Sequence, residues 1–143
     1  MLANAISAAT ADLRRAGEVV KAGASDDDIR HAVRHVRERL GAVLPEAYVS
    51  FLRQHDGFEF DGVVFYATQP RDGFWQGLVE ANEAWRDAPE NVDLLILGDD
   101  DMSFYAVSLN GSNPARHDRV TGEVVDKFDN VDDMITDAIN TRL

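Results

Sequence analysis

The stretch LPEAYVSFLRQHDG, residues 44–57, carries the strongest local structural signals in the chain. Pro45 suits the first turn of a helix, because its ring fixes φ and its missing N–H would have no intrahelical partner there. Asp56-Gly57 provides a C-terminal stop. Three large apolar residues share one face between these ends: Tyr48, Phe51 and Leu52. The pattern predicts a short helix that is defined at both ends and buried along its aromatic face.

The segments that follow this helix have the patterns of β-strands. FEFDGVVFY (58–66) has Asp61-Gly62 between two apolar runs, which is a strong hairpin signal. Apolar or alternating runs predict further strands at 92–98, 102–110, 115–120 and 123–128. The first two of these are separated by the acidic turn Asp99-Asp100-Asp101. Within 102–110 the expected core residues are Tyr105, Val107 and Leu109.

Helical patterns occupy both ends of the chain and one central segment, 74–86. Residues 2–20 have a loose apolar side, and Ser25 with Asp28 forms a capping-box sequence before a helix that ends at Gly41. A last helix follows Asn130. This order predicts an α+β fold, in which an antiparallel sheet of about six strands is flanked by N-terminal and C-terminal helices. We expect one domain over residues 1–143, with an additional N-terminal helix in residues 1–25.

Composition narrows the functional classes. The chain has 26 acidic and 14 basic residues, a net charge of −12, and the acid is concentrated in residues 42–101 and at the C-terminus. Such a surface repels nucleic acids and anionic membranes and attracts basic partners. There is no cysteine, no apolar run of membrane-spanning length and no basic segment before the apolar N-terminus. We therefore expect a cytoplasmic protein that binds neither nucleic acid nor membrane.

No catalytic or metal-binding motif stands out. His31 and His35 have metal-ligand spacing, but Arg34 and Arg37 would oppose a cation. The three consecutive aspartates lack the spacing of an EF-hand loop and suit a turn. His117-Asp118 has no nucleophile-elbow serine to complete a triad. The aromatic residues, among them Trp85 and Tyr66, are typical of a core, although aromatic side chains also anchor interfaces. We expect no enzymatic activity, no cofactor and no metal.

Residues 44–57 resemble the N-terminal hallmark of the SUKH superfamily, which has a Leu-Pro, an aromatic helix and then Asn or Asp before Gly. The departure is Asp56, where Asn is common. NEAWR (82–86), LLILGDDD (94–101), MSFYAVSLN (102–110) and VTGEVVDKFDNVDDMI (120–135) are similar to later parts of the pattern. NEAWR favours the YrhA-like branch. The resemblance covers about residues 26–142, and residues 1–25 have no counterpart in it.

The resemblance implies a non-enzymatic protein-binding module. Many bacterial members are immunity proteins that neutralise toxins, often nucleases, whereas fungal relatives regulate cell-wall assembly through protein contacts. We expect an immunity protein that binds a basic toxin domain, and the alternative is an intracellular regulatory or scaffold protein of the same fold without a toxin partner. The expected partner-binding residues are Glu59, Asp61, Trp75, Glu80, Asp99, Asp100 and Asp101.

Overall fold

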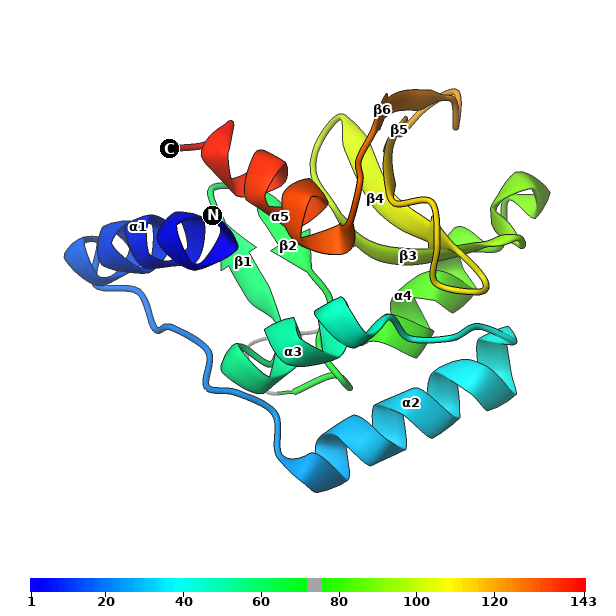
Figure 1. Cartoon of the computed structure of the whole chain (residues 1–143), viewed down its shortest axis with the longest axis horizontal. Coiled ribbons are helices and arrows are strands. Elements are labelled where there is room, and N and C mark those ends of the chain that lie inside the picture. Colours follow the sequence, from blue (N-terminus) through cyan, green and yellow to red (C-terminus); the bar gives the residue numbers. More distant parts are fainter. Residues whose placement is uncertain (72–75) are drawn as a thin grey trace.

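A six-stranded antiparallel sheet organises the computed structural model, which describes residues 1–71 and 76–143 (Figure 1). The strands are β1 (Phe58–Phe60), β2 (Val63–Phe65), β3 (Leu94–Asp99), β4 (Ser103–Ser108), β5 (Ala115–Asp118) and β6 (Val124–Lys127). The α-helices are α1 (Leu2–Arg15), α2 (Asp26–Leu40), α3 (Glu46–Gln54), α4 (Leu78–Trp85) and α5 (Val131–Asn140), and Pro89–Asn91 form a short 3-10 turn. The predicted α+β fold is confirmed.

The strands follow one another across the sheet in chain order, β1 to β6, and every neighbouring pair is antiparallel. The β1–β2 connection is the predicted hairpin. Its turn residues Asp61 and Gly62 have φ values of 47° and 87°. Positive φ at both positions is the type I′ geometry that matches the twist of a two-residue hairpin.

Helix α3 lies against the first strands, as its apolar face predicted. Phe51 is 3% exposed, and its ring packs edge-on against Phe58 and Phe65, with centroids 6.2 and 5.9 Å away. The Tyr48 hydroxyl donates to the carbonyl of Tyr66 at 2.6 Å. The aromatic face of residues 44–57 therefore joins the helix to the sheet through both apolar and polar contacts.

Helix α3 ends at Gln54 with His55 as its C-cap, slightly before the predicted Asp56-Gly57 stop, and Asp56 has a different role. Its buried carboxylate accepts hydrogen bonds from the Thr68 backbone N–H at 2.8 Å and the Thr68 hydroxyl at 3.0 Å. The Arg71 guanidinium donates to the same carboxylate at 2.9 Å. Asp56 thus ties the end of α3 to the segment after β2.

Strand β3 contains an irregularity that Gly98 makes possible. The pairing with β4 shifts register between Ile96 and Gly98. A Cβ atom at Gly98 would lie 2.4 Å from the Val64 carbonyl oxygen and 2.6 Å from the Phe65 ring. The absent side chain lets β2 approach β3 and leaves space for Phe65 beside Tyr105, whose ring centroids are 5.6 Å apart.

Both faces of β4 are buried, which corrects the expectation of a single core face. Tyr105 and Val107 are buried, but Phe104 on the opposite face is also buried and contacts Trp85 of α4, with centroids 5.1 Å apart. Leu109, expected in the core, is only partly buried. The reason is that α4 covers one face of the central strands while other helices cover the other face.

Several predicted boundaries shift. The first helix was expected to reach residue 20 but ends at Arg15, where the Glu18 N–H closes the last turn on the Leu13 carbonyl at 2.9 Å. The central helix starts at Leu78, not at 74, and residues 74 and 75 lie outside the described part. The strand expected at 115–120 ends at Asp118, because residues 119–122 form the turn to β6. The capping box at Ser25 and the cap at Asn130 are as predicted.

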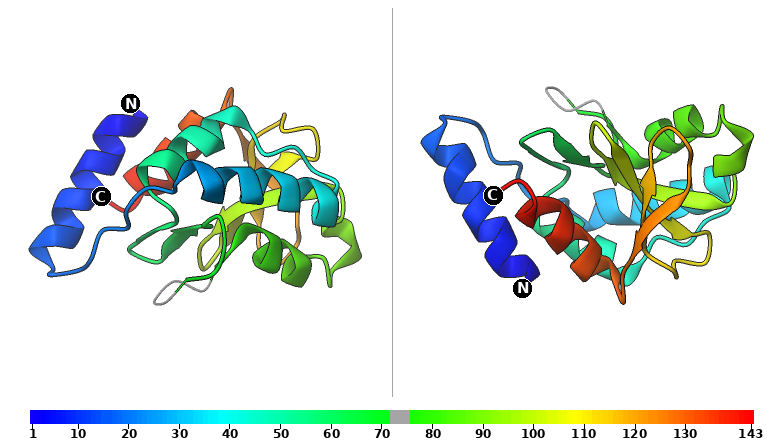
Figure 2. Two further views of the ribbon diagram at one scale, coloured as in Figure 1. Left: turned by 90° about the horizontal axis from the view of Figure 1, so that it is seen from below. Right: turned by 90° about the horizontal axis from the view of Figure 1, so that it is seen from above.

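Helices α1 and α5 lie side by side, as both the contacts and Figure 2 show. Helix α5 also contacts α3, so these three helices form one layer. Helix α2 contacts both α4 and α3. In the described part of the chain, none of the helices has both the length and the apolar character that a membrane-spanning helix requires.

Candidate functional site

Three hairpin turns meet at one end of the sheet, because the strands form a simple up-and-down meander. These turns are Asp61-Gly62, 100–102 and 119–122. The Arg119 N–H donates to the Met102 carbonyl at 2.9 Å, which joins the second turn to the third. Arg142, just after α5, donates to the Asp61 carbonyl at 2.7 Å and lies 3.3 Å from the Asp100 carboxylate. The same end of the sheet therefore collects residues from widely separated parts of the chain.

Asp100 organises the β3–β4 turn from inside. It is 7% exposed, and its carboxylate accepts hydrogen bonds from the backbone N–H groups of Met102 (2.9 Å) and Ser103 (2.8 Å) and from the Tyr105 hydroxyl (2.7 Å). Burial alone would raise the pKa of Asp100, but these three donors and the charge of Arg142 outweigh it and hold the pKa below its usual value. The Asp100 carboxylate therefore makes its hydrogen bonds within the protein and stabilises the turn.

The lowered pKa of Asp100 predicts a loss of stability in acid. A carboxyl group whose pKa is lower in the folded state stabilises the fold above its unfolded pKa of about 3.9, and this contribution disappears as pH falls through the folded pKa. The difference in free energy of unfolding between the wild type and Asp100→Asn should therefore be largest at neutral pH and shrink below about pH 4. Urea unfolding at neutral and acid pH measures it.

Asp101→Asn is the matched control, because Asp101 is on the same turn with an exposed side chain. A wild-type-to-Asp100→Asn difference that stays constant from neutral to acid pH would contradict the role assigned to Asp100.

A polar and aromatic cluster lies beside these turns. The Tyr66 hydroxyl donates to the Asp99 carboxylate and accepts from the Trp85 indole N–H at 2.9 Å. The Arg119 guanidinium lies over the Trp85 ring, 4.8 Å from its centroid, and 3.4 Å from the Asp99 carboxylate. Burial, followed by the charge of Asp99, raises the pKa of Tyr66. These residues line a shallow pocket of about 300 Å³.

Two apolar side chains project into solvent from the adjoining turns. Met102 is 76% exposed and Val120 is 92% exposed. The acidic residues Asp61 and Asp101 are exposed on the same end of the sheet. We call this region the tip surface, and it consists of Asp61, Asp101, Met102, Arg119 and Val120.

The predicted partner-binding residues fall into distinct places. Asp61, Asp99, Asp100 and Asp101 come together at the hairpin end, although only Asp61 and Asp101 have freely exposed side chains. Glu59 is exposed on β1 and shares a face with Asp99, because both align with Val64. Glu80 is exposed in the first turn of α4, at the opposite end of that helix from Trp85. Trp75 lies outside the described residues.

The other residues weighed for chemistry have local contacts. The rings of His31 and His35 lie 5.2 Å apart on α2. His117 stacks on Phe104 at 4.8 Å and pairs through Nδ1 with the Gly122 carbonyl, while Asp118 accepts from the backbone N–H groups of the turn that follows it. Within residues 1–71 and 76–143, no group of three or more His, Cys, Asp or Glu side chains is arranged to hold a metal ion.

Met102, Arg119 and Val120 are absent from the predicted site, because the expected strands placed them within β-structure. One signal was available in the sequence. Met102 directly follows three turn-forming aspartates, and Val120 directly precedes Thr121-Gly122. An apolar residue beside a turn has few neighbours to bury it, and two such residues on adjacent turns form a candidate contact surface.

Comparison with known proteins supplies the family context for this arrangement. The model of a family described as SMI1 / KNR4 family (SUKH-1) matches residues 23–137. This match supports the SUKH resemblance; the YrhA-like branch is not confirmed by it and stays a prediction. No curated protein matches the chain.

Proposed function

The chain belongs to the SMI1 / KNR4 family (SUKH-1), and from this premise we propose that it is an immunity protein that binds and neutralises a basic toxin domain through the tip surface. The binding is stoichiometric and non-enzymatic. The observation that carries the proposal is the exposure of Met102 and Val120 on adjoining turns beside acidic side chains.

The composition of the tip surface suits a protein partner. Met and Arg are enriched in interface cores, and exposed apolar side chains surrounded by polar groups are typical of docking surfaces. Arg119 is held in place by Asp99, Trp85 and the Asp100 carbonyl. A guanidinium that is already ordered loses little freedom when a partner packs against it.

Charge supports a basic partner. The net charge of −12 attracts a cationic domain and accelerates its encounter with the protein. Exposed carboxylates at the edge of an interface act mainly on the association rate and its dependence on salt, whereas buried apolar contacts act on the dissociation rate. Asp61 and Asp101 therefore have the steering role, and Met102 and Val120 have the anchoring role.

In the first experiment, a tagged copy of the protein is used to pull down its partner from a lysate of the native organism. The pull-down is done once in low salt and once in moderate salt. We expect one basic protein, recovered at low salt and reduced as salt rises. With that protein purified, Met102→Ala and Val120→Ala should each weaken binding at least about tenfold, mainly through faster dissociation. Asp101→Lys should slow association and flatten its salt dependence. Surface plasmon resonance measures both rates.

Val43→Ala is the matched control, because Val43 is 58% exposed but lies between α2 and α3 and not on the tip surface. Affinity unchanged by Met102→Ala and Val120→Ala, or reduced equally by Val43→Ala, would exclude the tip surface. Failure to recover any basic protein at either salt would favour a regulatory or scaffold role for the same fold.

A further inference from the structure

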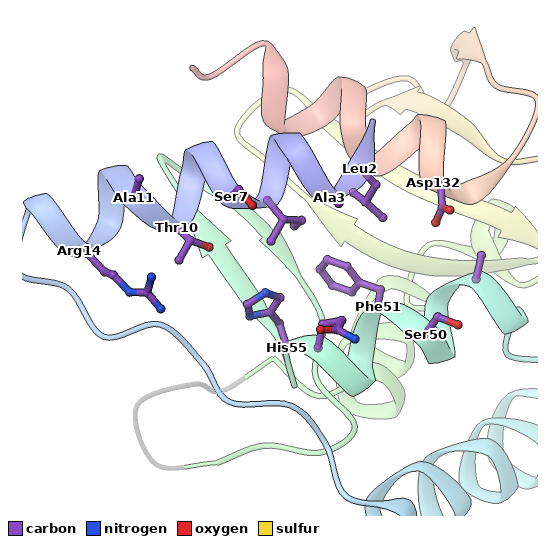
Figure 3. A pocket seen from close by; sticks show the side chains of 13 residues that line it. Leu2, Ala3, Ser7, Thr10, Ala11, Arg14, Ser50, Phe51, His55 and Asp132 are labelled. Carbon is purple, nitrogen blue, oxygen red and sulfur yellow. The ribbon is translucent and has the colours of Figure 1, made fainter.

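A second hollow lies between α1 and α3, and it is lined by none of the tip-surface residues. Its volume is about 740 Å³, within the range of roughly 300–1,000 Å³ that small-molecule sites occupy. Figure 3 shows its lining side chains coming from α1 above and α3 below, with one residue from α5. The apolar part of the lining consists of Leu2, Ala3, Ile6, Ala11, Ala47 and Phe51.

Thr10 places an unsatisfied polar atom in this hollow. The residue is 8% exposed, and its hydroxyl oxygen has no hydrogen-bond partner among the described residues. A buried hydroxyl without a partner destabilises the folded state, because it has lost its hydrogen bonds to water and gained none in return. Thr10 lines the hollow, but its hydroxyl oxygen is almost completely covered, so a bound polar group reaches it only when the side chains at this end move slightly.

Two further polar side chains, those of Arg14 and His55, lie at the same end as Thr10. Arg14 is exposed and has no ion-pair partner within the described part of the chain, whereas the neighbouring Arg15 pairs with Asp12. His55 Nδ1 lies 3.1 Å from the Lys21 carbonyl oxygen. Since a carbonyl only accepts, Nδ1 carries the hydrogen, and Nε2 is the ring nitrogen that remains for a ligand. Figure 3 shows Thr10, Arg14 and His55 together at one end of the hollow.

The opposite end has the opposite charge. Asp132, from the first turn of α5, lies there beyond Leu2 and Phe51 (Figure 3). An anionic group is therefore favoured near Arg14 and disfavoured near Asp132. The apolar side chains between the two ends suit a hydrocarbon chain, so the hollow would bind an amphipathic ligand in one orientation.

From these contacts we propose that the hollow between α1 and α3 is a binding site for a small amphipathic carboxylate. The carboxylate accepts hydrogen bonds from the Arg14 guanidinium and, once the side chains around it have moved slightly, from the Thr10 hydroxyl. The hydrocarbon chain lies on Phe51, Leu2 and Ile6. Helix α1 precedes the region that matches the family, so this site is formed between a segment outside that match and helix α3.

Isothermal titration calorimetry with octanoate and octanol tests this assignment, because the two probes share a hydrocarbon chain and differ in charge. We expect octanoate to bind at least about tenfold more tightly than octanol to the wild type. Arg14→Gln should weaken octanoate binding about tenfold or more, and Arg15→Gln is the matched control that should leave it unchanged. Thr10→Val should weaken octanoate binding while raising the midpoint of thermal unfolding, because it removes the unsatisfied hydroxyl.

Three results would overturn the site: no heat of binding with octanoate, equal affinities for octanoate and octanol, or equal effects of Arg14→Gln and Arg15→Gln. Unchanged octanoate affinity in Thr10→Val would show that its hydroxyl is a packing defect and would remove it from the site. Met102→Ala should leave octanoate binding unchanged, so the outcome is independent of the toxin-binding proposal.

Discussion

Phe51→Ala is expected to lower the free energy of unfolding by about 3–5 kcal/mol, the range for truncating a buried phenylalanine. Phe51 is 3% exposed, and its ring meets Tyr48, Phe58 and Phe65. Truncation leaves a cavity where α3 joins the sheet, and the strands cannot move in to fill it because their hydrogen-bond pairing holds them. Urea unfolding followed by far-UV circular dichroism measures the change.

Two variants at the same helix calibrate this result. Phe51→Leu keeps much of the apolar volume and should cost clearly less than the alanine variant. Ser50→Ala changes an exposed neighbour and should change the free energy of unfolding by less than about 0.5 kcal/mol. An unfolding midpoint that Phe51→Ala leaves unchanged would be incompatible with the packing of α3 on the sheet.

Asn82→Ala is expected to cost roughly 2–5 kcal/mol, because it leaves buried backbone groups without partners. The Asn82 side chain accepts a hydrogen bond from the Ile96 N–H at 2.7 Å and donates to the Ile96 carbonyl at 2.8 Å. Strand β2 ends at Phe65, so this edge of β3 has no strand beside Ile96, and the amide of Asn82 takes the place of one. Chemical denaturation of the variant measures the loss.

Asn82→Asp separates hydrogen bonding from packing at this position. It keeps the acceptor for the Ile96 N–H but directs a carboxylate at the carbonyls of Leu78 and Ile96, which the native amide contacts as a donor. The variant should be strongly destabilised at neutral pH and recover in part in acid, where the protonated carboxyl group donates. Glu83→Ala, at an exposed residue of the same helix, should cost at most about 1 kcal/mol. Equal stability of Asn82→Ala and the wild type would contradict the role of Asn82 in the sheet.

The candidate site was only partly predictable, because exposure depends on what packs nearby. Asp99, Asp100 and Asp101 are three identical consecutive residues, yet Asp99 binds Tyr66, Asp100 is buried with three hydrogen-bond donors and the charge of Arg142 around it, and Asp101 is exposed. The donor to Asp99, Tyr66, and the cation beside Asp100, Arg142, come from distant positions in the chain. The number of residues between two side chains does not indicate that they lie close together in the folded protein.

The NEAWR segment illustrates the same limit. Its sequence predicted a helix and resembled a family pattern, but it did not indicate which hydrogen bonds its residues make. Asn82 completes β3, Trp85 donates to Tyr66, and Arg86 donates to the Leu40 carbonyl at the end of α2 at 3.0 Å. Each partner lies on a different element, so these hydrogen bonds exist only after the elements have packed.

The sequence by itself determined the local elements. Four of these signals depend only on residues that are close in sequence, so they can be recognised without the structure. They are the aromatic face of 44–57, the Asp61-Gly62 turn, the Ser25 capping box and the cap at Asn130. The tertiary structure alone decided that both faces of β4 are covered, which aspartate is exposed, and that Met102 and Val120 lie at the same end of the sheet. These properties arise from contacts between segments far apart in the chain, and burial by such contacts is what separates a structural side chain from one that a partner can reach.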